Sequence, residues 1–245
     1  MNAFAKLGRY VSLIYHSLRS IYEVKVYRTN FIDELVKIGY ESIFIVLLTG
    51  VFTGAVMTLQ TSYQFASAFI PRSIIGSIVV QSVVIELAAV VTSLVLSGKV
   101  GARIATELGT MRVSEQIDAL ESMGFNSVSF LIVPRILAGI IMFPVLYIIA
   151  TIIAIAGGLA AGVISGALPA SDFLLGARTS FYPANILFGL LKAFVFGFVI
   201  TSVSCYNGYY ASGGAEGVGT ATTTATVMSC IYVLLADFLL AVFVL

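Results

Sequence analysis

The stretch PRILAGIIMFPVLYIIATIIAIAGGLAAGVI, residues 134–164, decides the fold class of this 245-residue chain. Its one charged residue is Arg135, in its first turn, and it stays apolar to its end. A hydrocarbon core of roughly 30 Å needs about 20 apolar helical residues, so this run predicts a membrane-spanning helix with length to spare for tilting. Pro134 suits the first turn, where the missing N–H has no helical partner in any case.

The composition extends this prediction to the whole chain. Hydrophobic residues make up 59% of it and charged residues only 10%, against about 25% charged in an average soluble domain. Four further apolar runs are long enough to cross a bilayer. The sequence therefore predicts an all-α membrane protein with five transmembrane helices, at about 43–60, 74–97, 134–165, 184–206 and 221–245.

Residues 1–30 form a separate amphipathic segment. Apolar side chains from Phe4 to Ile21 recur at spacings of three and four, with basic residues between them. This pattern predicts a helix lying in the membrane interface, the alternative being an amphipathic helix packed on protein. Six Lys or Arg precede the first span and four lie within 99–135, against Arg72 and Arg178 in the other loops, so the positive-inside rule predicts a cytosolic N-terminus.

The segment between the second and third predicted spans, residues 99–135, carries eight charged side chains. Apolar residues from Leu108 to Leu120 recur with helical spacing, and the acidic residues Glu115, Asp118 and Glu121 recur at three. We predict two short helices joined near Gly109, with a stop at Gly124. Either this segment docks a soluble partner through its free face, or it is a solvated helix that binds nothing.

No enzyme constellation is present in the sequence. His16 is the one histidine, Cys205 and Cys230 lack metal-ligand spacing, and Gly98-Lys99 has neither the preceding glycine nor the following hydroxyl of a phosphate-binding loop. We therefore predict no catalytic residue, no metal site and no cofactor in this chain. The net charge of +1, with scattered basic residues, argues against a nucleic-acid partner.

Three charged residues fall inside predicted spans. Glu86 either lines a polar route or makes a structural hydrogen bond at a helix contact; Asp237 is predicted to be structural, and Lys192 to snorkel towards the interface. No basic residue stands at helical spacing from either acid, so a proton relay is not supported. Small residues predict close helix packing. They are Gly50 and Gly54 in the first span and Gly158 and Gly162 in the third.

Three motifs carry a family resemblance. They are Glu86-Leu87, the run GKVGARIATELGTMRVSEQIDAL at 98–120, and NGYYASGGAEGVGTATT at 207–223. Together they resemble the MlaE family of ABC transporter permeases, with similarity over roughly residues 35–245. The resemblance implies a permease domain at 31–245 that forms a homodimer in the bacterial inner membrane, with a periplasmic C-terminus.

The resemblance also implies partners and site residues. Family members work with a cytosolic ABC ATPase, which binds ATP and Mg, and with an extracytoplasmic Mce-domain protein, and they move phospholipid or related lipid between membranes. The segment Glu107 to Leu120 resembles the cytosolic coupling helix. The implied coupling residues are Glu107, Leu108, Gly109, Thr110, Met111, Arg112, Glu115, Gln116 and Asp118, and the implied lipid pathway takes in Leu59, Gln60, Tyr63 and Glu86.

Several positions depart from the family pattern. Ala88 and Ala89 stand where many relatives have Gly-Pro, which predicts a straighter second helix, and Lys99, Thr220 and Thr224 replace frequent arginines. Two other functions stay open at this point. One is a secondary transporter or channel that uses Glu86 and Asp237 as ion sites, and the other is a membrane anchor that recruits soluble proteins without transport.

Overall fold

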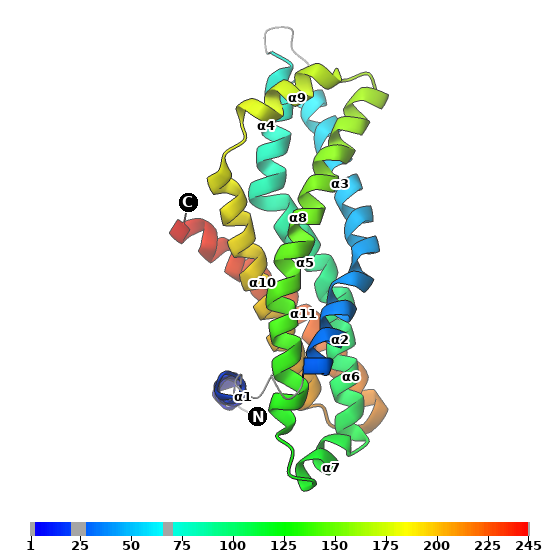
Figure 1. Cartoon of the computed structure of the whole chain (residues 1–245), viewed down its shortest axis with the longest axis vertical. Coiled ribbons are helices and arrows are strands. Elements are labelled where there is room, and N and C mark those ends of the chain that lie inside the picture. Colours follow the sequence, from blue (N-terminus) through cyan, green and yellow to red (C-terminus); the bar gives the residue numbers. More distant parts are fainter. Residues whose placement is uncertain (1–2, 21–27, 66–70, 245) are drawn as a thin grey trace. The chain divides into compact units, whose positions relative to one another are not determined.

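The computed structural model describes residues 3–20, 28–65 and 71–244, and within these ranges it is helical without strands. Five helices in this part of the chain are long and apolar enough to cross a membrane (Figure 1). They are Arg28–Gln64, Ser73–Val113, Val128–Ile164, Pro183–Tyr209 and Gly214–Val244. The prediction of an all-α membrane protein with five long apolar helices is confirmed.

Three of these long helices contain π-helical turns or short breaks. The first comprises α2 (Arg28–Ile38), the 3₁₀ turn η2 (Tyr40–Ser42) and α3 (Ile43–Gln64). The second comprises α4 (Ser73–Ser82), the π turn η3 (Val83–Leu87), α5 (Ala88–Leu96), the π turn η4 (Ser97–Gly101) and α6 (Ala102–Val113). This helix contains two π turns, and the prediction that Ala88 and Ala89 make it straighter than in relatives with Gly-Pro stays a prediction. The third comprises the π turn η5 (Val128–Ile132) and α8 (Val133–Ile164).

Other elements differ from the predicted boundaries. The fourth and fifth long helices are α10 (Pro183–Tyr209) and α11 (Gly214–Val244), so most of the glycine-rich stretch 207–220 is helical rather than a loop. Positive φ angles at Gly213 and Gly214 make a tight turn possible, which leaves four residues between the helices. The connection 167–184 contains α9 (Ala170–Thr179), and α2 begins at Arg28 rather than near Phe31.

The chain divides into two compact units. Unit 1 comprises Met1–Ser42, Leu94–Met142 and Val195–Leu239, and unit 2 comprises Ile43–Ser93, Phe143–Phe194 and Leu240–Leu245. In unit 1, α6 and α10 approach each other closely at Gly208, which has no side chain. A Cβ at this position would lie only 2.8 Å from the carbonyl oxygen of Ala105. Ile104 and Phe196 are fully buried in the same unit.

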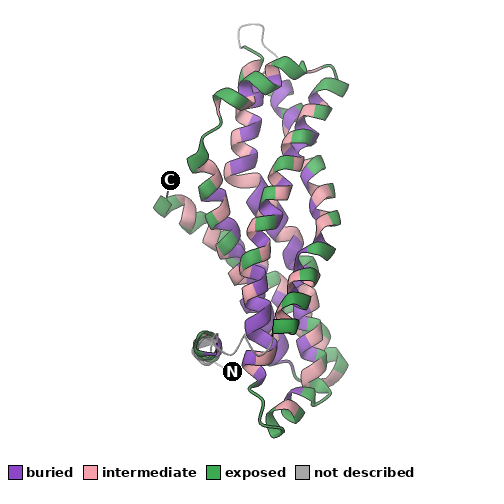
Figure 2. Cartoon of the chain, viewed as in Figure 1, coloured by how far each residue is buried: buried purple, intermediate pink, exposed green. Residues whose placement is uncertain are grey.

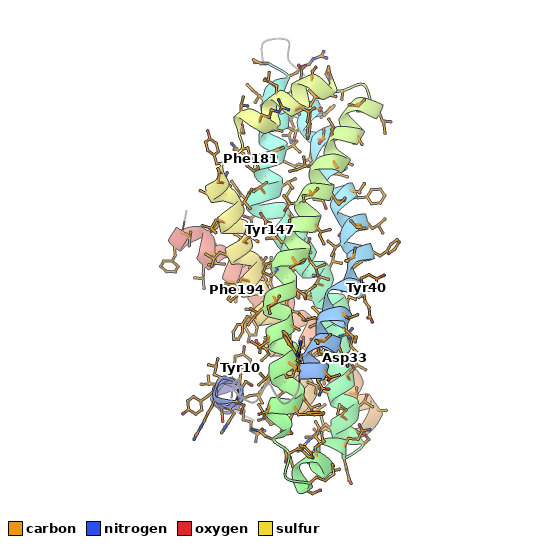
Figure 3. The ribbon with its side chains drawn as sticks, in the orientation of Figure 1. Tyr10, Asp33, Tyr40, Tyr147, Phe181 and Phe194 are labelled. Atoms are coloured by element: carbon orange, nitrogen blue, oxygen red, sulfur yellow. The ribbon has the colours of Figure 1, made fainter. Side chains whose placement is uncertain are left out.

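The N-terminal helix α1 (Ala3–Arg19) belongs to unit 1. The Tyr10 hydroxyl lies 2.8 Å from Ser202 Oγ on α10, and its ring meets Tyr206 edge to face (Figure 3). Leu13 is buried, whereas Val11 and Leu18 are more than half exposed. One face of α1 therefore packs on protein, and its other face leaves apolar side chains open. Its place in the membrane interface stays a prediction.

Glycines bring helices of unit 2 into backbone contact. A methyl group at Gly54 of α3 would overlap the carbonyl of Ala154 on α8, and a Cβ at Gly158 would lie 2.6 Å from Thr58 Oγ1. Gly50 faces the Ala150 carbonyl, and Gly162 faces Thr58 and Leu168. In the same unit, α4 and α9 cross at Gly76 and Gly176, where Ser77 donates a hydrogen bond to the Gly176 carbonyl at 3.0 Å.

We expect Gly54→Ala to destabilise the protein by about 1–3 kcal/mol, because backbone atoms cannot move aside as a flexible side chain can. The measurement is thermal stability in detergent. Gly98→Ala is the matched control, since nothing lies within 4 Å of a Cβ at that position. Equal stability of the two variants would contradict close packing of α3 on α8.

Candidate functional site

The segment between the second and third long helices forms a projecting tip of unit 1. Helix α6 continues through Gly109 to Val113, and α7 (Gln116–Ser122) follows after a sharp turn. Glu115 makes this turn with φ of 60°, the one positive φ of a non-glycine residue in the described part of the chain. The prediction of a joint near Gly109 was wrong, because Gly109 packs against Val218 and Ala211 and so serves close helix contact.

Much of the tip is exposed (Figure 2), and its exposed side chains are a mixture of apolar and acidic ones. Met123 is 63% exposed, Phe125 46% and Val113 38%. Around them lie the predicted coupling residues that face outward, namely Thr110, Glu115, Gln116 and Asp118, with Met111 and Arg112 partly exposed. Ile117 is fully buried and anchors α7. Gly124, with φ of 82°, follows the end of α7 as predicted.

Asp118 has a charged partner within its own chain. Its carboxylate accepts a hydrogen bond from Arg112 at 2.7 Å. The Arg112 guanidinium also lies 5.9 Å from the centre of the Tyr209 ring on α10. The two groups are partly solvated, so the pair contributes little stability but orients the exposed end of α7.

A hydrogen-bonded cluster joins α7 to the end of α10. Ser127 donates to Glu121 Oε1 at 2.6 Å, Tyr209 donates to the same oxygen at 3.0 Å, and the two hydroxyl oxygens are 2.8 Å apart. The Ser127 hydrogen bond is the main reason why the pKa of Glu121 lies below its ordinary value; Tyr209 and Arg112 lower it further, and desolvation opposes them. The ionised carboxylate is therefore the form that holds α7.

We expect the docking of α7 to depend on pH. Because the pKa of Glu121 is lower in the folded state, its contribution is complete above the ordinary value of 4.5 and is lost as pH falls through the lowered value. Amide hydrogen exchange of α7, expressed as protection factors, should fall in that acidic range. Glu121→Gln should remove this step, whereas Glu115→Gln should preserve it. A step that persists in Glu121→Gln would contradict this assignment.

The other predicted coupling residues face inward. Leu108 is fully buried, Gly109 is buried, and Glu107 joins an ion-pair cluster with Arg103, Arg135 and Glu34. Glu107, Leu108 and Gly109 are therefore not part of the exposed tip. Sequence reasoning missed this cluster; the spacing of four between Arg103 and Glu107 is the one local signal that pointed to it.

A second charged pair lies in unit 2. Lys192 of α10 is fully buried, its ammonium donates to Glu86 at 2.6 Å, and it lies 4.8 Å from the centre of the Phe188 ring. The prediction that Lys192 snorkels was wrong, because this carboxylate and this ring replace water around the ammonium. Glu86 sits in the π turn η3, where the Tyr147 hydroxyl donates to the Val84 carbonyl at 2.8 Å (Figure 3).

The remaining predicted lipid-pathway residues lie on α3. Leu59 is 42% exposed and Tyr63 86%, and Gln60 is exposed as well. Phe52 and Val56 continue the same open face along α3. These residues form an apolar surface with polar groups at its end, whereas Glu86 is engaged with α10. Glu86 is thus a helix-contact residue in this structure, although its side chain is 43% exposed.

Comparison with known proteins gives consistent matches. A family model described as Permease MlaE matches residues 31–243. A probable ABC transporter permease of Rickettsia bellii is 40% identical over 234 residues, covering 96% of this chain and 90% of the relative. A probable ABC transporter permease of Synechocystis is 36% identical, covering 90% of this chain and 84% of the relative. The chloroplastic protein TRIGALACTOSYLDIACYLGLYCEROL 1 of Arabidopsis thaliana is 34% identical, covering 89% of this chain and 62% of the relative.

Proposed function

Because the chain belongs to the MlaE permease family, and is thus a multi-pass ABC transporter permease, we propose that it moves phospholipid or a related lipid between the inner and outer membranes of a bacterium. A separate cytosolic ATPase binds ATP and Mg and drives this movement. The chloroplast relative is named after a glycolipid, which supports a lipid substrate.

The exposed α6–α7 tip is the observation that carries the proposal. Met123, Phe125 and Val113 present apolar area, and Glu115 adds a negative charge beside them. A partner protein can bury such apolar groups at the centre of an interface while charged groups form its rim. The positive-inside rule puts this tip in the cytosol together with the N-terminus, and the C-terminus in the periplasm.

Two further surfaces support the proposed assembly. The exposed face of α11 begins with the small residues Gly219, Thr220 and Thr223 and continues with Ile231 and Leu235, which suits close contact with a second copy of the chain. By the positive-inside rule, the loop that contains α9 would face the periplasm. Within this loop α9 exposes Leu174 and Leu175. This short helix offers a contact for an extracytoplasmic Mce-domain protein.

The test is reconstitution of the permease with an ABC ATPase from the same genome, in vesicles that contain a fluorescent phospholipid. We expect lipid movement to acceptor vesicles with ATP, and none with ADP or without the ATPase. Full-rate lipid movement by the permease alone would contradict the ATP-driven mechanism. Movement of ions instead of lipid would favour a secondary transporter. An ATPase whose hydrolysis rate is the same with and without the permease and the lipid would favour a membrane anchor.

A further inference from the structure

Four charged side chains of unit 1 form a closed ring of alternating sign, here called the charge ring. Glu34 comes from α2, Arg103 and Glu107 from α6, and Arg135 from the first turn of α8. Around the ring, the four ion-pair distances are 3.3 Å for Arg103 to Glu34, 3.2 Å for Glu34 to Arg135, 3.0 Å for Arg135 to Glu107 and 3.3 Å for Glu107 to Arg103.

We propose that the charge ring transmits movement of the α6–α7 tip to the first and third long helices, with Glu34, Arg103 and Arg135 as positioning residues. This inference rests on the proposed function, since it needs an ATPase that moves the tip. Glu107 lies in the middle of the continuous helix α6, a short distance in sequence before the exposed Val113. A displacement of the tip therefore displaces Glu107 with it.

Burial makes the attraction around the ring strong. The side chains of Arg135 and Glu34 are 7% and 8% exposed, so their charges interact with little screening by solvent. Every member has two neighbours of opposite sign, and the four charges sum to zero. Separating α6 from α2 or α8 would leave buried charges without compensation, which is much less favourable than moving the three helices together.

The ring is nevertheless able to adjust its geometry. The Nε atoms of Arg103 and Arg135 lie within ion-pair distance of carboxylates, yet neither makes a hydrogen bond. Charge attraction depends weakly on angle, whereas a hydrogen bond depends on it steeply. Glu34 and Glu107 each lie within ion-pair distance of both arginines. After a small shift of α6, an arginine can therefore donate its hydrogen bond to the other carboxylate while the four charges stay together.

Contacts beyond the ring extend the connection along the first long helix. Arg103 donates to the Lys37 carbonyl at 3.0 Å and to the Glu41 carboxylate at 3.2 Å, and Lys99 donates to the Glu41 carbonyl. These contacts reach the end of α2 and the turn η2, immediately before α3. Movement of α6 is thus delivered to the segment that leads into the apolar part of the first long helix.

The experiment measures ATP hydrolysis and fluorescent phospholipid movement by the complete permease–ATPase assembly in vesicles. We expect Glu34→Gln to lower the lipid moved per ATP hydrolysed by about two- to thirtyfold, the range typical of residues that couple distant sites. Asp33→Asn is the matched control: it is the same acid-to-amide change, one residue away, at an exposed position outside the ring. This control should keep the ratio of the unmodified protein.

A paired variant separates transmission from folding. Glu34→Gln with Arg135→Gln removes one charge of each sign, so it should assemble even if Glu34→Gln alone does not fold. If the paired variant assembles and hydrolyses ATP but moves less lipid per ATP, the inference is supported. If it moves lipid as efficiently as the unmodified protein, the inference is overturned. Absence of ATP-driven lipid movement in the unmodified assembly would overturn the proposed function instead.

Discussion

Phe125→Asp combined with Met123→Asp should abolish tight binding of the ATPase while leaving the permease folded. Both side chains are largely exposed at the tip of unit 1, so their replacement costs little within the chain. At an interface, loss of a central apolar anchor typically costs about 2 kcal/mol or more, equivalent to about a thirtyfold weaker complex. We expect at least this loss, measured as the dissociation constant of the detergent-solubilised permease for the ATPase.

The matched control for this prediction is Phe181→Asp with Tyr182→Asp. These aromatic residues have comparable exposure but lie between α9 and α10, on the other side of the membrane by the proposed topology. They should leave ATPase affinity unchanged. If both double variants bind the ATPase as tightly as the unmodified permease, the α6–α7 tip is not the docking surface, and the anchor or channel alternatives gain support.

Glu86→Gln should be strongly destabilising, by about 3–5 kcal/mol, because it takes the carboxylate at 2.6 Å away from a fully buried ammonium. Lys192→Met should cost less. The carboxylate of Glu86 is 43% exposed, so it tolerates loss of the ammonium better than Lys192 tolerates loss of the carboxylate. The measurement is thermal unfolding of the detergent-solubilised protein, followed by intrinsic tyrosine fluorescence.

The paired variant Glu86→Gln with Lys192→Met provides the internal control. If the pair acts as a structural unit, the paired variant should be more stable than Glu86→Gln alone. In the paired variant, no buried ammonium of Lys192 is left facing the neutral amide of the introduced glutamine. Additive losses from the two single changes would contradict direct coupling. Near-normal stability of Glu86→Gln together with lost ion movement would instead favour the secondary-transporter alternative.

Local patterns in the sequence were sufficient for the fold class and for the location of the tip. Apolar runs long enough to cross a bilayer identify spans without tertiary information. The recurrence of acidic residues every three positions from Glu115 to Glu121 indicates a helix. Boundaries were less predictable in the stretch 207–220. Its glycines suggested a connection between two spans, but most of the stretch is helical in the structure, where Gly208 allows α10 to pack on α6.

The charged contacts between distant residues could not be predicted. Arg135 and Glu34 are about a hundred residues apart, as are Lys192 and Glu86, and no periodicity relates them. Lys192 was expected to reach water because a long ammonium side chain usually does so when it can. Its actual position depends on whether the neighbouring helix brings a carboxylate within reach.

The sequence by itself determined that this is a five-span helical membrane protein with a projecting polar segment, because hydrophobic length and periodicity act locally along the chain. The tertiary structure alone decided that Glu107 turns inward to the charge ring, that Glu115 makes the turn before α7, and that Lys192 meets Glu86. Charge pairing is a short-range contact in space between residues remote in sequence, so it exists only once the helices have packed.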